Sequence, residues 1–164
     1  MVTGQRVSRA EVEVRLAGET DTADLVRLRR MMWGAMGVED VSQLNATDEA
    51  AAAYFSAAIA AGTFHGWLAL TDTGTAVGAG GVVIDQHPPG PGNLSGRIGY
   101  VMNLVTDSRY RRRGIGRRIM ETILGWLKEQ GVRHVSLHAT EAGRPLYEEL
   151  GFVDSNEMRL TMAR

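Results

Sequence analysis

The sequence predicts an α/β (α+β) fold in which a central mixed β-sheet is flanked by about four helices. Segments with the period-2 alternation of strands are interspersed with segments of helical spacing. Two β-α-β units in the C-terminal half require parallel pairing there, whereas a hairpin before them is antiparallel. The 164 residues, 44% hydrophobic and 23% charged, suit one soluble globular domain over residues 1–164.

The first predicted elements are a strand and two helices. Residues 12–16 alternate apolar and polar side chains, as in a strand with one buried face. Residues 20–24 supply a helix start. The alanine-rich segment 48–61 predicts a second helix, with Thr47 as its N-cap and Gly62 at its end. The apolar residues at helical spacing in the first helix are Leu25, Leu28, Met31 and Met32.

The middle of the chain is predicted to be antiparallel. Strands over 64–70 and 76–84 are joined by a short turn with a glycine, which is typical of a hairpin. The segment 87–93 is rich in proline and glycine, so it cannot continue a strand and is predicted to be a surface loop. A strand over 97–106 follows it.

The C-terminal half alternates helices and strands. Apolar residues at i, i+4 spacing predict a helix over 115–127, which Gly131 ends. A strand over 132–139, a short helix over 142–150 and a final strand or hairpin arm over 152–162 complete the sheet.

The turn from Arg109 to Arg118, between the strand over 97–106 and the helix that follows, carries most of the functional information. Backbone N–H groups and the positive end of a helix dipole at such a turn can hold a phosphate. Gly114 and Gly116 let a ligand approach the backbone without meeting a Cβ. No Gly-Lys-Ser/Thr and no third glycine follow, which excludes two common phosphate motifs. Up to five charges surround this predicted diphosphate site, from Arg111, Arg112, Arg113, Arg117 and Arg118.

Composition narrows the function classes. The net charge of −1 argues against bulk electrostatic binding to nucleic acid or to an anionic membrane. A nucleic-acid contact through the arginine turn is a weaker alternative, because Tyr110 is the one aromatic residue beside it. The absence of cysteine excludes disulfides, thiolate zinc sites and a cysteine nucleophile. No signal-peptide or membrane-span pattern is present, so we expect a cytoplasmic protein.

Two motifs resemble those of the GNAT superfamily of N-acyltransferases. Residues 110–116, Tyr-Arg-Arg-Arg-Gly-Ile-Gly, follow a strand that ends in Leu-Val-Thr and are similar to the Arg/Gln-x-x-Gly-x-Gly/Ala motif that binds the acyl-CoA pyrophosphate. Residues 138–152 resemble the strand–helix segment that ends in Leu-Tyr-Glu-x-x-Gly-Phe. The resemblance covers residues 97–164 and implies a GNAT-like fold. The earlier segment agrees with the family in topology alone.

The resemblance implies an acetyl-CoA-dependent N-acetyltransferase, with acetyl-CoA as co-substrate and no metal. The acetyl group would pass to a primary amine of a small molecule by direct attack in a ternary complex. The backbone of Leu104 and Thr106 would pair with the pantetheine arm as an extra strand would. The residues expected at the cofactor are Leu104, Val105, Thr106, Arg111, Arg112, Arg113, Gly114, Ile115, Gly116 and Thr140.

The resemblance also implies catalytic roles. A backbone N–H near Leu104 would bind the acyl oxygen, and Tyr147 would protonate the leaving thiolate, although a core aromatic is the alternative for this tyrosine. Met102 stands where many members place a glutamate base, so the base is not assigned. His138 is the first candidate, because it ends a strand beside the expected opening of the sheet, and a packed histidine is the alternative. Asn103 could instead orient a water.

The sequence indicates less about the amine acceptor than about the cofactor. Glu39 and Asp40 could attract a cationic amine or belong to a solvated loop. An apolar cluster could wall the acceptor pocket or face the core. A non-catalytic acyl-CoA-binding regulatory module remains the alternative function, because Met102 replaces the usual glutamate. The family often dimerises, which makes a homodimer an expectation. The residues of the apolar cluster are Met31, Met32, Trp33 and Met36.

Overall fold

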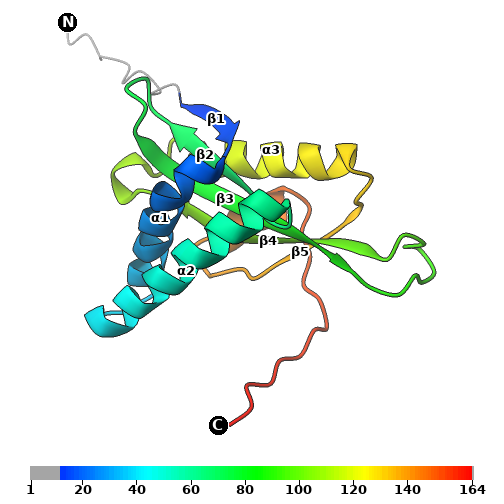
Figure 1. The fold of residues 1–164 in the computed structure, drawn as a ribbon. Helices are drawn as coiled ribbons and strands as arrows, with labels where there is room; N and C mark the ends of the chain where they lie inside the picture. The colour runs from blue at the N-terminus through cyan, green and yellow to red at the C-terminus, as the bar shows by residue number, and fades with distance from the viewer. Residues whose placement is uncertain (1–11, 164) are drawn as a thin grey trace, which may run out of the picture.

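The computed structural model describes residues 12–163. Its five strands form one sheet in the order β1-β2-β3-β4-β5, and helices cover both faces (Figure 1). The elements along the chain are β1 (Glu13–Leu16), α1 (Thr22–Ala35), α2 (Val41–Ala61), β2 (His65–Leu70), β3 (Ala76–Gln86), β4 (Arg97–Thr106), α3 (Ile115–Glu129), β5 (His134–Leu137) and α4 (Arg144–Glu149). Short 3-10 turns at Glu19–Asp21 and Ser108–Tyr110 precede α1 and follow β4.

The sheet is mixed, as the sequence predicts. Strands β1 to β4 pair antiparallel, and β4 pairs parallel with β5 across the crossover helix α3. Parallel pairing runs only from Ile98–His134 to Val101–Leu137, while β4 continues to Thr106. The last part of β4 therefore has a neighbour on its β3 side and an opening on its β5 side.

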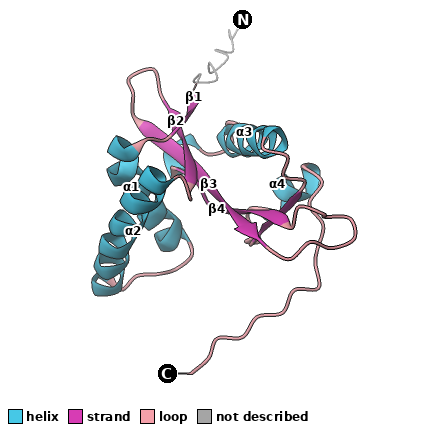
Figure 2. Ribbon diagram, turned by 45° about the vertical axis from the view of Figure 1, so that its right-hand side comes forward, coloured by secondary structure: helices cyan, strands magenta, loops and turns pink. Residues whose placement is uncertain are grey.

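Two apolar cores lie on opposite faces of the sheet. Helices α1 and α2 cover one face, where Leu25, Leu28 and Phe55 pack on Phe64 and Leu68. Figure 2 shows α3 and α4 on the other side. The helix α3 contributes one buried stripe to that face, and burying such side chains stabilises the fold by about 1.5–3 kcal/mol each. The stripe consists of Ile115, Ile119, Met120, Ile123 and Leu127.

Close packing brings α3 against the strands. A Cβ at Gly80 of β3 would lie 2.6 Å from Cγ2 of Ile119, so only glycine admits the helix at this distance. Because α3 is held this closely, its first turn lies beside the end of β4. This placement brings the arginine turn next to the opening in the sheet.

A bulge in β4 alters which residues face each core. The pairing of β3 with β4 shifts between Ala79 and Gly81, and Asn103 has a φ of 61°. Val101 and Leu104 pack on the α3 face, whereas Met102 belongs to the α1 face. Asn103 also bonds to α1, so two consecutive residues point to one side, as in a β-bulge.

The second helix begins earlier than the sequence predicts. It starts at Val41, where the carboxylate of Asp40 accepts a hydrogen bond from the Gln43 N–H at 3.1 Å. Thr47 lies inside the helix and donates its hydroxyl proton to the Gln43 carbonyl, so its predicted role as N-cap was wrong. Gly62 ends the helix with a φ of 70°, as predicted.

The final strand predicted over 152–162 does not form. Residues 152–163 have no regular secondary structure, and the chain runs away from the sheet (Figure 1). Strand β5 is the edge of the sheet and ends at Leu137, and residues 152–163 do not pair with it. The second β-α-β unit is therefore absent, and Leu16 of β1 is also more exposed than predicted, at 53%.

Candidate functional site

The arginine turn presents a row of backbone N–H groups without protein acceptors. Gly114, with a φ of 78°, caps α3, and Arg112 also has a positive φ of 59°. The first N–H of this segment that bonds within the protein is that of Arg118, which donates to the Gly114 carbonyl at 3.1 Å. Among residues 12–163, the N–H groups of 111–117 have no hydrogen-bond acceptor. Such a row at a helix N-terminus suits an anion.

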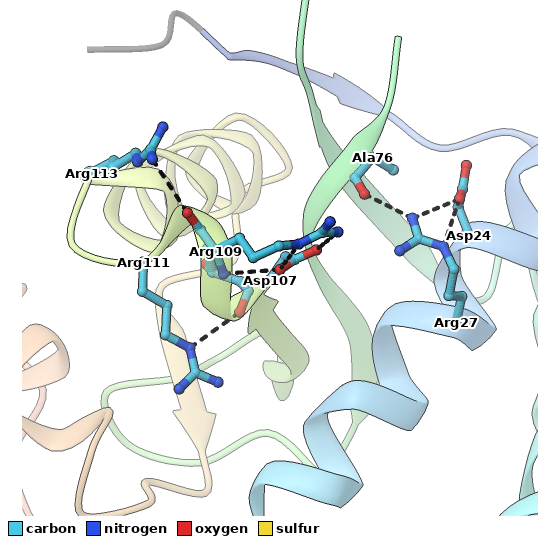
Figure 3. A network of polar contacts seen from close by, with 8 residues as sticks. Asp24, Arg27, Ala76, Asp107, Arg109, Arg111 and Arg113 are labelled. Atoms are coloured by element: carbon cyan, nitrogen blue, oxygen red, sulfur yellow. Dashed lines mark hydrogen bonds and ion pairs between the residues drawn. The ribbon is translucent and has the colours of Figure 1, made fainter. Parts of the chain in front are cut away.

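A buried carboxylate, Asp107, fixes the start of this turn. Its side chain accepts hydrogen bonds from the Arg109 backbone N–H at 3.0 Å and from the Arg109 guanidinium at 2.8 Å (Figure 3). These bonds hold the pKa of Asp107 below its ordinary value, against the opposing effect of burial. The N–H of Asp107 donates to the Val77 carbonyl at 2.8 Å, which ties the turn to β3. We did not identify this anchor from the sequence.

The arginines of the turn are not equivalent. Arg111 and Arg113 leave it in different directions, towards the Thr106 carbonyl at 3.4 Å and the Arg109 carbonyl at 3.3 Å (Figure 3). Arg112 and Arg118 are exposed. Arg117 forms ion pairs with Glu149 of α4 and with Glu121. The predicted set of five charges around a diphosphate therefore loses Arg117 to a contact between helices.

The opening beside β4 exposes the backbone groups predicted for the pantetheine arm. The N–H of Asp107 points to β3, and the polar groups of successive residues alternate between the two edges of a strand. Those of Leu104 and Thr106 consequently face the opening. The side chain of Val105 packs in the core of the α1 face, so any contact that it makes with a ligand involves its backbone.

Tyr147 lies on α4 beside this region and is 9% exposed. Its ring belongs to the core of the α3 face and packs edge-on against Phe152, with centroids 5.9 Å apart. Burial raises the pKa of the Tyr147 phenol. Helix α4 adjoins the arginine turn, because a Cβ at Gly116 would lie 3.6 Å from Cδ2 of Leu146. Tyr147 thus combines a buried ring with a position next to the predicted diphosphate site.

His138 lies one residue beyond β5 and is exposed. Its Nδ1 contacts the Tyr100 hydroxyl and lies 2.8 Å from Nη2 of Arg159. Desolvation raises the pKa of Tyr100. His138 and Tyr147 both line a cleft of about 610 Å³ along β5 and α4. The structure brings the two predicted catalytic residues to one cleft, which the arginine turn does not line.

The remaining predicted residues have local roles. The hydroxyl of Thr140 accepts a hydrogen bond from the Gly143 N–H at 3.2 Å, at the start of α4. Asp40 caps α2, and Glu39 is exposed beside it. Met31 and Met32 pack against the core of the α1 face, whereas Met36 is 54% exposed.

No group of three or more potential metal-binding side chains occurs among the described residues. None of the helices in that part of the chain has the length and apolar character needed to cross a membrane. The cytoplasmic location stays a prediction.

Comparisons with known proteins agree on one family. The family model described as the acetyltransferase (GNAT) family matches residues 26–152. Glucosamine 6-phosphate N-acetyltransferase 1 of Oryza sativa subsp. japonica is 30% identical over 112 residues, 67% of this chain and 66% of that protein. Glucosamine 6-phosphate N-acetyltransferase of Trypanosoma brucei brucei is 29% identical over 91 residues, 55% and 60% of the two chains. The chain thus spans slightly less than two thirds of the length of these relatives.

Solved structures show the same fold. A GCN5-related N-acetyltransferase from Ralstonia eutropha superposes with a TM-score of 0.84 and 29% identity, over 93% of this chain and 99% of that one. A predicted acetyltransferase with acetyl-CoA from Clostridium acetobutylicum has a TM-score of 0.83 and 25% identity, over 93% and 96%. The mixed sheet with helices on both faces is therefore shared with proteins of this family.

Proposed function

The chain belongs to the GNAT family of acetyltransferases, and on this basis we propose that it transfers an acetyl group from acetyl-CoA to a primary amine of a small molecule. The single observation that best supports this function is the row of free N–H groups over 111–117, at the start of α3 and beside the opening in the sheet. A phosphate-binding turn and an exposed strand edge in this arrangement match the two ends of an extended cofactor.

The residues present fit acetyl-CoA. The N–H groups of 111–117 would hold the pyrophosphate, with charge supplied by Arg111, Arg112 and Arg113. The backbone of Leu104 and Thr106 would bind the pantetheine amides in the manner of an added strand. The nearest protein atom to a Cβ at Gly116 would be Cδ2 of Leu146 at 3.6 Å, so the glycine leaves room for a phosphate beside the N–H groups.

Acetyl-CoA supplies an activated acetyl group in direct attack by the amine. The N–H of Leu104 would donate to the acyl oxygen as negative charge develops there. Tyr147 would give its proton to the departing sulfur, and its raised pKa keeps the phenol protonated near neutral pH. The hydroxyl of Tyr147 has no hydrogen-bond partner among the described residues, which leaves the proton available.

We assign to His138 the role of the base that removes the proton from the amine. Met102 has no ionisable group, and it packs against the core of the α1 face. His138 lies close to the end of the β4–β5 pairing at Val101–Leu137. Arg159 can only donate to Nδ1, which puts the proton of the neutral ring on Nε2, so His138 would accept the amine proton at Nδ1 in place of this contact.

Amino sugar phosphates are the first acceptors to test. The curated relatives named above are glucosamine 6-phosphate N-acetyltransferases at 29–30% identity. A thiol-release assay with acetyl-CoA and a panel of amines, including glucosamine 6-phosphate, tests the proposed function. Release of free thiol that depends on an amine supports it. Binding of CoA without thiol release above background would instead favour the regulatory module that Met102 leaves open.

A homodimer forms part of the same proposal. Three apolar side chains alternate along the unpaired C-terminal segment, and they are 81–93% exposed. Strand β5 has a free edge, so pairing of this segment with β5 of a second copy would bury these side chains. The residues are Met158, Leu160 and Met162.

A further inference from the structure

Three polar side chains meet where α1 crosses the bulge of β4. We call them the Arg29 cluster, which consists of Arg29, Trp33 and Asn103. Nη1 of Arg29 donates a hydrogen bond to Oδ1 of Asn103 at 3.0 Å. The guanidinium carbon of Arg29 lies 4.9 Å from the centroid of the Trp33 ring. We propose that the Arg29 cluster binds an anionic group, a phosphate or a carboxylate, of the amine acceptor.

The charge of Arg29 has no counterion within the described chain. Its two arginine neighbours on α1 are both paired: Arg27 with Asp24 at 2.9 Å and Arg30 with Asp48 at 2.5 Å. Arg29 is half-buried, and desolvation lowers its pKa. Guanidinium stays charged in proteins, and a partly buried cation without an anion is unfavourable. An incoming anion would compensate for this.

The other two members of the Arg29 cluster each have a donor without an acceptor among the described residues. Nε1 of Trp33 and Nδ2 of Asn103 are buried and have no hydrogen-bond partner within residues 12–163. Asn103 is 4% exposed, and its oxygen already accepts from Arg29. Buried donors are nearly always satisfied in native proteins. The groups left unsatisfied are all donors, so the cluster suits an anion and does not suit a cation.

The position of the Arg29 cluster points to the acceptor and away from the cofactor. Arg29 and Trp33 lie on α1, on the face of the sheet opposite α3. Asn103 directly precedes Leu104, whose N–H is proposed to bind the acyl oxygen. An anion held here would therefore be part of a small molecule whose amine reaches the acetyl group. Amino sugar phosphates and amino acids both have this combination. This inference rests on the proposed acetyl transfer.

The competing explanation is structural, because Arg29 could simply hold Asn103 in its positive-φ conformation. Arg29→Gln separates the two roles: glutamine can still donate a hydrogen bond to Asn103 but carries no charge. Arg30→Gln is the matched control, since it removes a neighbouring charge that is already paired with Asp48. Each variant is tested on two pairs of acceptors, glucosamine 6-phosphate against glucosamine and an α-amino acid against its amide.

We expect wild-type kcat/KM to be about tenfold or more higher for the anionic member of at least one pair, which identifies phosphate or carboxylate. Arg29→Gln should lower kcat/KM for that member by about ten- to a hundredfold, mainly through KM, and leave the neutral member unchanged. Arg30→Gln should change neither. An equal loss for both members, through kcat, would show a positioning role and overturn the proposal. A wild type without preference for the anionic member of either pair would also overturn it.

A second readout does not depend on turnover. The chain has 3 tryptophans, and the indole N–H signal of Trp33 can be assigned in a nitrogen–proton spectrum with Trp33→Phe. In the presence of CoA, the preferred anionic amine should shift this signal in wild type and not in Arg29→Gln. The signals of Trp67 and Trp126 should stay in place in both proteins, which confirms folding. If the Trp33 signal shifts but the protein transfers no acetyl group, the proposed function is wrong and the proposed anion site stands. If the Trp33 signal does not move, the proposed anion site is wrong.

Discussion

Asp107 anchors the arginine turn through bonds that need its negative charge. Replacing it with asparagine removes the buried charge that the two Arg109 hydrogen bonds stabilise, and we expect a lower free energy of unfolding. Asp24→Asn is the control, because Asp24 pairs with Arg27 at the surface and such pairs contribute about 0–1 kcal/mol. Urea titrations of both variants at neutral pH measure the difference.

The Asp107 effect should depend on pH. The pKa of Asp107 is lower in the folded protein than in the unfolded chain, where it is about 3.9. The stabilisation is therefore complete above the unfolded value and is lost as pH falls through the folded value. The gap in stability between wild type and Asp107→Asn should narrow below about pH 4. A gap that stays constant down to acid pH would show that the charge of Asp107 is not responsible.

Tyr147 tests the assignment of the catalytic acid. Tyr147→Phe removes a hydroxyl without a hydrogen-bond partner among the described residues, so the melting temperature should change little. If the phenol protonates the leaving sulfur, kcat should fall by about 10²–10⁴-fold. Because burial raises the phenol pKa, wild-type activity should not decline with its ionisation until the pH exceeds about 10. Full turnover by the variant would assign Tyr147 to the core alone.

At the scale of elements, two substitutions test at which residue α2 begins. Asp40→Ala removes the N-cap bond to the Gln43 N–H and should destabilise the protein by about 1 kcal/mol. Thr47→Ala lies inside the helix and should have a smaller effect. Thermal melts of the two variants compare these positions. If Thr47→Ala were the more damaging change, the helix would begin later than the structure has it. An acceptor KM that is unchanged by Asp40→Ala would leave the capping role as the only one.

Elements with local signals could be predicted from the sequence, and elements that depend on distant partners could not. The helix α3 has its own apolar stripe and a glycine at each end, so the helix and the turn before it were predicted as elements. The start of α2 was missed because Asn45, Thr47 and Asp48 are all good N-cap residues. The bulge at Asn103 depends on the pairing of β4 with β3, and the contact of Asn103 with Arg29 joins residues 74 positions apart in sequence.

At the scale of the whole molecule, the C-terminal segment predicts assembly. Apolar residues alternate with polar ones over 158–162, as in a strand, but a strand needs a partner, and within residues 12–163 this segment has none. The predicted strand was therefore wrong within this chain, because a local pattern does not show whether a strand has a partner. The same limit applies to the arginines of the turn, because the sequence does not show that Arg117 forms an ion pair with Glu149 of α4.

Light scattering on purified protein tests this assembly. We expect a dimer for wild type and a monomer for Leu160→Glu, because a charge on the apolar side of the segment would oppose its burial against a second copy. Thr161→Glu places the same charge on the alternate side and should remain dimeric. A monomeric wild type at micromolar concentrations would contradict the proposed pairing.

The measurement that tests the central claim most directly is calorimetry of acetyl-CoA binding to two matched glycine variants. Gly116→Glu and Gly125→Glu make the same substitution in α3, and neither position has a positive φ or a neighbour closer than 3.6 Å. Only Gly116 lies at the free N–H groups. The account predicts micromolar binding by wild type and by Gly125→Glu, and none by Gly116→Glu. Equal binding by all three proteins, or no binding by wild type, would contradict it.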